Sequence, residues 1–182
     1  MSIEKVQSSN KLLSVPYSSG REFCGIINYL KRNSNIYNEL NITSSSLYQY
    51  DRRFSPFNVI EYDDIYAEFH TDDLANSWIR FELKNHKIVP KNYQIRTFAL
   101  GRNTSHMKSW VLECSNMGNE WEILDAKNDC ADLNGGNCMH AFPVNNPMNK
   151  EFKFARIRQT GPNWRGKNFL KVNSIEFFGF II

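Results

Sequence analysis

The sequence contains no long hydrophobic run. No segment approaches the roughly 18 consecutive apolar residues of a membrane helix, and the amino terminus, MSIEKVQSSNKLL, has no apolar centre like that of a signal peptide. We therefore expect a soluble protein with a cytoplasmic location.

Cysteine patterns that would indicate a metal site or a redox motif are also missing. The four cysteines are Cys24, Cys114, Cys130 and Cys138. They form no CxxC pair and have no Cys/His spacing typical of zinc. We interpret them as reduced thiols. A disulfide between Cys130 and Cys138 stays open as an alternative if the protein is exported.

Patterns for catalysis are equally scarce. The four histidines are His70, His86, His106 and His140. Their spacing does not suggest a metal site, and no cysteine lies in a nucleophile motif. We expect no enzyme, no catalytic residue and no cofactor. The aspartates at 72–73, or those at 129 and 132, could instead hold a structural calcium through loop oxygens.

The bulk composition describes an ordinary globular protein. A net charge of +3 and a pI of about 8.6 are too low to indicate a nucleic-acid interface, which needs a dense basic stripe. The 14% of aromatic residues favours β structure. A chain of 182 residues forms one domain most simply. We expect a polar, serine-rich segment at 1–22 and the domain at 23–182.

Short segments with strand-like composition recur along the chain. In the clearest, WIRFEL, Ile79 and Phe81 would face one way and Arg80 the other. The expected strands span 41–46, 78–83, 93–98, 110–114, 121–124, 154–159 and 173–178. No convincing helical period is present, although 23–30 could form a short helix or a strand. This pattern predicts an all-β, antiparallel, two-sheet sandwich.

Antiparallel strands would sort the connections by end. The segments expected to share one end are 47–77, 101–109, 125–141 and 160–170. The tight turns near 84–91, 115–120 and 144–151 would share the other end. Long irregular loops on a rigid scaffold commonly bind ligands, so the first group is where we place the ligand site. The loop TGPNWRG, which presents an indole and a cation between two glycines, is its most informative part.

The expected ligand-binding side chains come from all of these long loops. They are Tyr48, Arg52, Phe54, Arg102, His106, Asn137, His140, Trp164 and Arg165. Most aromatic residues of 47–77 are expected to hold that loop on the core, with Phe54 or Tyr48 as the exposed exception.

Several motifs together resemble the F5/8 type C, or discoidin-like, domains of the galactose-binding-domain-like superfamily. The similarity covers about 23 to 179 and includes the turn SNMGNEW and the ending RIRQTGPNWRGKNFLKVNSIEFFG. It is greatest to the intracellular branch that accompanies BTB, kelch or ubiquitin-ligase modules. The resemblance implies a jelly-roll sandwich that binds ligands with the loops at one end. The usual disulfide between the termini has no counterpart here, in agreement with an intracellular setting.

The first functional hypothesis is recognition of a protein or peptide. The segment GRNTSHM is similar to the GR-x-T-H-M segment of the DOC domain, with Ser105 inserted, and this similarity implies protein recognition. Arg102 and Arg165 would bind carboxylates or carbonyl groups through their forked donors, and Trp164 would give a flat contact.

Two other ligand classes stay open. A glycan could stack on Trp164 while His106, Asn137 or His140 bonds its hydroxyl groups. Binding to an anionic membrane, the third hypothesis, requires exposed hydrophobic side chains among Phe54, Met107 and Trp164. The larger assembly and the oligomeric state do not follow from the sequence.

Overall fold

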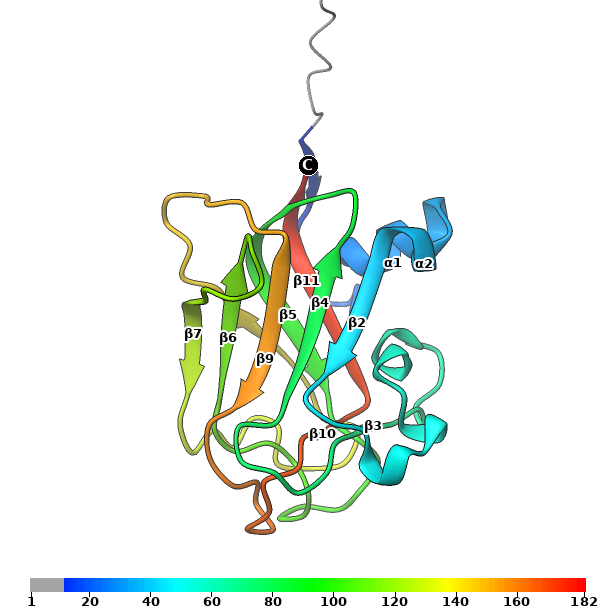
Figure 1. Ribbon diagram of the computed structural model, residues 1–182, viewed down its shortest axis with the longest axis vertical. Helices are drawn as coiled ribbons and strands as arrows, with labels where there is room; N and C mark the ends of the chain where they lie inside the picture. The colour runs from blue at the N-terminus through cyan, green and yellow to red at the C-terminus, as the bar shows by residue number, and fades with distance from the viewer. Residues whose placement is uncertain (1–11) are drawn as a thin grey trace, which may run out of the picture.

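The computed structural model describes residues 12–182 and has two antiparallel sheets packed face to face (Figure 1). The five-stranded sheet contains, in spatial order, β2 (Leu40–Ser44), β4 (Trp78–Leu83), β9 (Phe154–Gln159), β6 (Trp110–Ser115) and β7 (Glu122–Lys127). The four-stranded sheet contains β1 (Leu13–Val15), β11 (Ser174–Ile181), β5 (Ile88–Arg96) and β8 (Met139–Pro143). A short pair joins β3 (Phe69–His70) to β10 (Lys171–Val172). The predicted all-β antiparallel sandwich is confirmed.

The core lies between the two sheets, and the period-two pattern of β4 shows why. Ile79, Phe81 and Leu83 are buried, whereas the residues between them are half-exposed. Phe81 meets Phe177 of β11 edge-on across the core, with ring centroids 5.1 Å apart. Burying one face of each strand is what holds two such sheets together.

A bulge in β11 depends on a glycine. The pairing of β11 with β5 shifts register between Phe178 and Gly179, and Gly179 has a φ of +141°. A Cβ on Gly179 would lie only 2.1 Å from the carbonyl oxygen of Val89. Only glycine fits this close approach of two strands.

The helical elements are short. They are α1 (Ile26–Asn33), α2 (Ile36–Glu39) and three single-turn 3-10 segments, η1 (Tyr48–Tyr50), η2 (Arg52–Phe54) and η3 (Pro56–Ile60). The run 23–30, for which the sequence left helix and strand open, forms most of α1, and Ile26, Ile27 and Leu30 are its buried residues. No helix within residues 12–182 is long and apolar enough to span a bilayer.

Two strands differ from the sequence-based expectation. β8 begins inside the segment expected to be a loop at 125–141 and continues to Pro143. The sequence does not predict it, because Met139 and His140 are exposed and give no apolar alternation. β1 lies within the polar segment 1–22 and pairs with the last residues of β11. The sandwich therefore includes residues 13–15, and residues 1–11 of that segment lie outside the described part.

The antiparallel registers place the long connections together, as the sequence predicts. The segments 45–77, 97–109, 128–138 and 160–173 follow or precede strands at one end of the sandwich, which is the lower end in Figure 1. We call this end the loop end. The shorter connections 84–87, 116–121 and 144–153 lie at the opposite end.

Candidate ligand-binding site

The loop at 160–173 is shaped by the buried side chain of Asn163. Its Oδ1 accepts hydrogen bonds from the backbone N–H groups of Arg165 and Lys167, at 3.1 and 3.0 Å. Its Nδ2 donates to the carbonyl oxygen of Phe169 at 3.3 Å. A single buried amide thus closes the turn that presents Trp164 and Arg165.

A second pair of loops is joined by two asparagines. The backbone N–H of Asn103 donates to Oδ1 of Asn134 at 2.7 Å, and Nδ2 of Asn134 donates to Oδ1 of Asn103 at 2.8 Å. Gly136 lies so close that a Cβ would come within 2.5 Å of the Leu100 carbonyl oxygen. Loops 97–109 and 128–138 therefore form one packed unit.

The aspartates at 72 and 73 hold loops together rather than facing each other. Oδ1 of Asp72 accepts the N–H of Gln49 at 3.2 Å, and Oδ1 of Asp73 accepts the N–H of Asn168 at 2.6 Å. Within residues 12–182, no group of three or more His, Cys, Asp or Glu side chains is arranged to hold a metal ion. The calcium alternative, which relies on Asp72 and Asp73 or on Asp129 and Asp132, is not supported by such a cluster in this part of the chain.

An aromatic cluster, formed by Tyr48, Phe54, His70 and Phe169, lies under the first long loop. The rings of Tyr48 and His70 stack with centroids 4.3 Å apart, and Phe54 and Phe169 meet His70 edge-on at 5.6 and 4.6 Å. Burial, assisted by the positive charge of Lys171, lowers the pKa of His70 to about 4, so the ring is neutral at pH 7.

Because of this cluster, the exposed aromatic residues of the first loop, Tyr50 and Tyr66, are not the predicted ones. Tyr48 and Phe54 are half-buried, while Tyr50 between them is 90% exposed. The expectation that Phe54 or Tyr48 projects into solvent is therefore wrong. Gln49 and Tyr50 both adopt positive φ angles, which turn Tyr50 away from the cluster and could not be read from the sequence.

His106 is buried at 2% exposure and supports its loop from inside. Its Nε2 lies 3.1 Å from the carbonyl oxygen of Leu100 and 3.0 Å from that of Gly101, so this nitrogen bears the proton and donates it. Its own carbonyl oxygen accepts the backbone N–H of Trp164 at 3.2 Å. The prediction that His106 faces a ligand is wrong, because the side chain is buried and its Nε2 is hydrogen-bonded to backbone carbonyl oxygens.

Trp164 is half-buried, and its Nε1 is a buried atom with no hydrogen-bond partner in the described chain. The ammonium of Lys108 lies 5.1 Å from the centre of its ring. Met107 beside it is 1% exposed. The membrane hypothesis is therefore weakened, because Met107 is buried and neither Phe54 nor Trp164 projects freely.

The remaining predicted side chains are exposed at the loop end. The side chains of Arg52, Arg102 and Arg165 form no hydrogen bond or ion pair with any residue of 12–182. Asn137 is exposed, and His140 is exposed with Nε2 3.7 Å from an Asp132 carboxylate oxygen. The predicted residues thus share one end, but their side chains do not converge on a single point.

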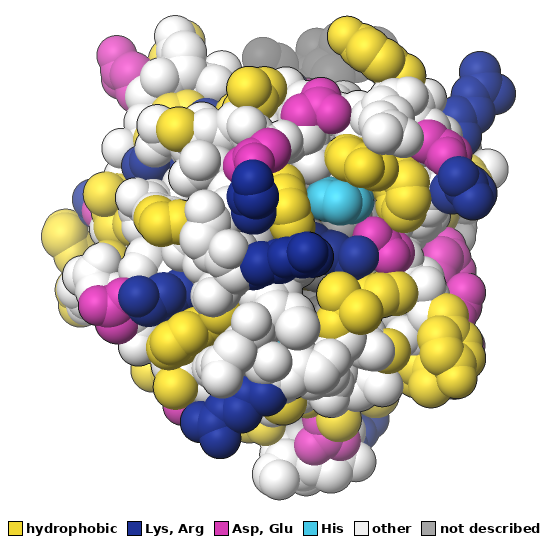
Figure 2. Space-filling view, turned by 90° about the horizontal axis from the view of Figure 1, so that it is seen from below, with side chains coloured by type: hydrophobic (Ala, Val, Ile, Leu, Met, Phe, Trp, Pro, Cys, Tyr) yellow, Lys and Arg dark blue, Asp and Glu magenta, His cyan; other side chains and the backbone are white. Residues whose placement is uncertain are grey.

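Seen from below, the loop end has basic side chains across its middle, a histidine beside them and hydrophobic side chains on either side (Figure 2). Tyr50 belongs to this surface, and His70 and Phe169 support it from the aromatic cluster, but none of the three is among the predicted residues. A signal for Tyr50 is present, since it lies between Tyr48 and Arg52, both of which are predicted ligand contacts. No local pattern distinguishes His70 or Phe169, because a distant loop packs against each of them.

The fold is an antiparallel jelly-roll β-sandwich, and several solved structures share it. One is a family 32 carbohydrate-binding module from Clostridium perfringens in complex with GalNAc-beta-1,3-galactose, with a TM-score of 0.59, 14% identity, and coverage of 76% of this chain and 94% of that chain. Another, from NanJ of the same organism and in complex with galactose, has a TM-score of 0.57, 11% identity, and coverage of 79% and 93%. A fucolectin from Morone saxatilis has a TM-score of 0.59, 13% identity, and coverage of 81% and 47%.

The proteins that are similar to this chain in sequence differ in kind from the similar solved structures. No family model matches the chain. The E3 ubiquitin-protein ligases Ufd4 of Drosophila melanogaster and hecd-1 of Caenorhabditis elegans are each 26% identical to it over 128 residues, which are 69% and 70% of this chain. The matched region spans only 5% of the length of each ligase.

Proposed function

We propose that the chain is a non-catalytic glycan-binding module and that its site is the loop end. Support comes from the similar solved structures, several of which are carbohydrate-binding modules or lectins, with galactose or a galactose-containing disaccharide bound in two cases. The observation that carries the proposal is the exposure of Tyr50 at this end of the same fold. An exposed aromatic ring offers the flat apolar face on which a sugar ring stacks.

The polar groups near Tyr50 fit the hydroxyl groups of a sugar. Arg52 brings a guanidinium that is not engaged by any carboxylate of the described chain, whereas Arg53 is held by Asp51 at 2.6 Å. Asn137 and Arg165 are exposed on other loops of the same end. Hydroxyl groups both donate and accept, so exposed amide and guanidinium groups at the end that presents an aromatic ring suit them.

The test is titration of the 182-residue protein with galactose and with N-acetylgalactosamine up to millimolar concentration, after a glycan array. We expect Tyr50→Ala to weaken binding about tenfold by removing the stacking face. Tyr37→Ala is the matched control, because Tyr37 is 62% exposed on α2, far from the loop end. A wild-type protein with no signal on the array and no heat at millimolar sugar would contradict the proposal.

Protein recognition is the second candidate function, and the ligase matches favour it. Both sequence relatives are E3 ubiquitin-protein ligases, and the free forks of Arg102 and Arg165 suit carboxylate or carbonyl groups of a partner. Protein recognition is also consistent with the cytoplasmic location that we expect from the sequence. A pull-down with wild type and with Arg102→Ala/Arg165→Ala separates the two functions. Partners that the wild type captures in the presence of free galactose, and that the variant does not capture, favour protein recognition. Partners that free galactose releases from the wild type favour glycan binding.

A further inference from the structure

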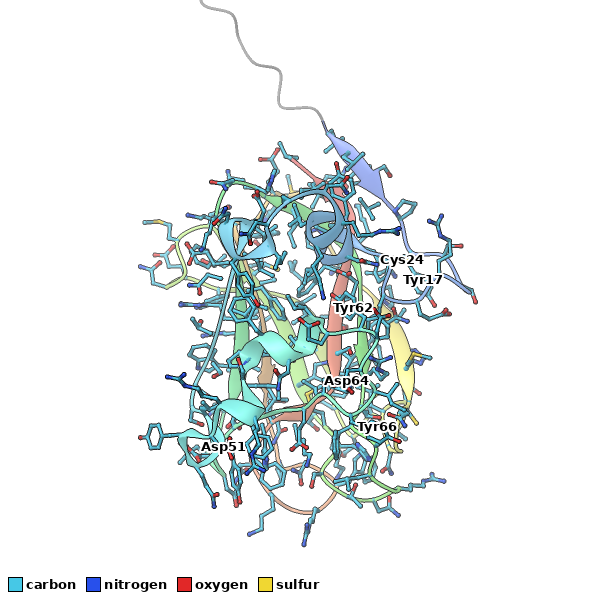
Figure 3. The ribbon with its side chains drawn as sticks, turned by 90° about the vertical axis from the view of Figure 1, so that its right-hand side faces the viewer. Tyr17, Cys24, Asp51, Tyr62, Asp64 and Tyr66 are labelled. Atoms are coloured by element: carbon cyan, nitrogen blue, oxygen red, sulfur yellow. The ribbon has the colours of Figure 1, made fainter. Side chains whose placement is uncertain are left out.

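A groove of about 470 Å³ lies between β1 and α1, at the end of the sandwich opposite the loop end. All three residues of β1 line one wall, and residues of α1 line the other. Cys24, which is exposed and also lines the groove, lies beside β1 in the upper part of Figure 3, whereas Asp51 and Tyr66 lie near the loop end. We call this hollow the β1–α1 groove.

The charged side chains of residues 12–182 that line the β1–α1 groove are both positive. Arg21 and Arg32 line it, both are exposed, and neither side chain forms a hydrogen bond or ion pair with any residue of 12–182. No acidic residue of the described part of the chain lines it. A neighbouring hollow shares Asn28 and Arg32 and is lined by Asp63 as well.

This absence of partners is unusual for a cation of the described chain that lies away from the loop end. Lys31, also on α1, lies 3.3 Å from a carboxylate oxygen of Glu61. Away from the loop end, the other lysines and arginines of residues 12–182 contact a carboxylate, a carbonyl oxygen or another polar side chain, as in the pairs of Arg156 and Arg158 with Glu113. Two arginines without partners facing one hollow are suited to binding carboxylates, because a guanidinium binds them through two parallel hydrogen bonds.

The other wall offers backbone groups. β1 lies at the edge of the four-stranded sheet, and its strand neighbour is β11, with Leu13 opposite Ile181 and Val15 opposite Gly179. In an antiparallel ladder, alternate backbone groups of an edge strand point away from its partner. An extended peptide can bind such an edge by adding a strand, with its side chains alternating between the two faces.

The helical wall is fixed in place before any ligand arrives. Glu176 of β11 is fully buried, and its carboxylate oxygens accept the N–H groups of Ile27 and Asn28, each at 2.9 Å, at the first turn of α1. Gly25 lies directly over it, and a Cβ there would lie 2.6 Å from Cγ of Glu176. A wall held in this way costs little reorganisation on binding.

We propose that the β1–α1 groove binds an acidic peptide segment in extended conformation, which pairs with β1 and directs its carboxylates to Arg21 and Arg32. The positive charges of the groove favour an acidic peptide over a neutral or basic one. Residues 1–11 of the chain itself match it poorly, because they contain one acidic residue, Glu4, and two basic ones, Lys5 and Lys11. The groove is separate from the loop end, so this proposal does not depend on the glycan function.

The test uses the 182-residue protein and a fluorescein-labelled peptide of alternating Glu and Thr, followed by fluorescence anisotropy at low salt. We expect Arg21→Gln/Arg32→Gln to weaken binding about tenfold or more, because charge-assisted hydrogen bonds are lost. Arg102→Gln/Arg165→Gln is the matched control. It removes the same charge from exposed arginines at the loop end and is expected to leave binding within about twofold. A peptide with Pro in place of Thr keeps its carboxylates but loses N–H donors, and should bind more weakly.

Cysteine alkylation locates the bound peptide. Cys24 lines the groove, whereas Cys130 and Cys138 belong to the connection between β7 and β8 at the loop end. Saturating peptide should slow the alkylation of Cys24 alone. Equal weakening by both arginine pairs, undiminished binding of the proline peptide, protection of Cys130 and Cys138 instead of Cys24, or no binding at all would each overturn the proposal.

Discussion

The loop end and the β1–α1 groove both present arginines without partners, but the chain supports them in different ways. At the loop end, irregular segments are held by side chains such as those of Asn163 and Asn134, which replace regular backbone pairing. At the groove, Arg32 lies on α1 and Arg21 on the segment that joins β1 to α1, and one buried carboxylate, that of Glu176, anchors the helix. The two surfaces should therefore be separable by mutations at their supports.

Removing the carboxylate under α1 should have the largest effect. Glu176→Ala leaves the N–H groups of Ile27, Asn28 and Phe177 without their acceptor in a fully buried place. We expect a loss of about 4 kcal/mol in the free energy of unfolding, measured by urea denaturation. Hydrogen exchange should accelerate in 26–33 and stay unchanged in 160–173.

The matched control for this variant is Glu61→Ala. Glu61 is also near α1 but its side chain is 55% exposed, and it pairs only with Lys31. Its removal should change the free energy of unfolding by less than about 0.5 kcal/mol. If Glu176→Ala is no more destabilising than Glu61→Ala, the helix is not anchored by the buried carboxylate, and the distinction between the two ends is lost.

The same carboxylate should make the groove end sensitive to pH. Burial raises the pKa of Glu176 to about 7 from its ordinary 4.5, against the opposing effect of the N–H donors. A raised pKa means that the folded protein binds this proton more tightly than the unfolded chain. The stability that depends on it is fully present below pH 4.5 and is lost as the pH rises to about 7.

Comparison with Glu176→Gln isolates this contribution, because glutamine does not titrate. The free energy of unfolding of the wild type, relative to that of the variant, should fall by about 3 kcal/mol between pH 4.5 and pH 7.5. Urea denaturation at intervals of pH measures it. A relative stability that rises with pH would mean that the N–H donors outweigh burial and that the pKa is lowered instead.

At the loop end the corresponding support is Asn163. Asn163→Ala removes the acceptor for two N–H groups and the donor to Phe169, and we expect a loss of about 2 kcal/mol. Hydrogen exchange should accelerate in 160–173 and not in 26–33, the reverse of the Glu176 result. Asn168→Ala is the control in the same loop, since its side chain makes no hydrogen bond within the described chain. Similar losses from both variants would show that Asn163 does not shape the loop.

The contrast between the ends also explains what the sequence could predict. Strands such as β4 bury one face, so buried residues such as Ile79 and Phe81 recur with a period of two that the sequence shows. The antiparallel order of the strands then determines at which end of the sandwich each loop lies. Burial within loops has no such period. The contacts of His106 with carbonyl oxygens depend on the folded turn, so the sequence does not distinguish it from a ligand-binding histidine. The β1–α1 groove could not be predicted, because β1 has only three residues and no sequence pattern shows that α1 lies across from it.

The smallest expected effect concerns the arginines themselves. Because Arg21, Arg32, Arg102 and Arg165 are exposed and contact no carboxylate of the described chain, replacing either pair by glutamine should change the free energy of unfolding by less than about 0.5 kcal/mol. Thermal denaturation of the two double variants beside wild type measures this. If these arginines serve binding, each double variant should lose binding of its ligand without losing stability. A clear destabilisation of one pair alone would instead identify those arginines as part of the structural support of their own end.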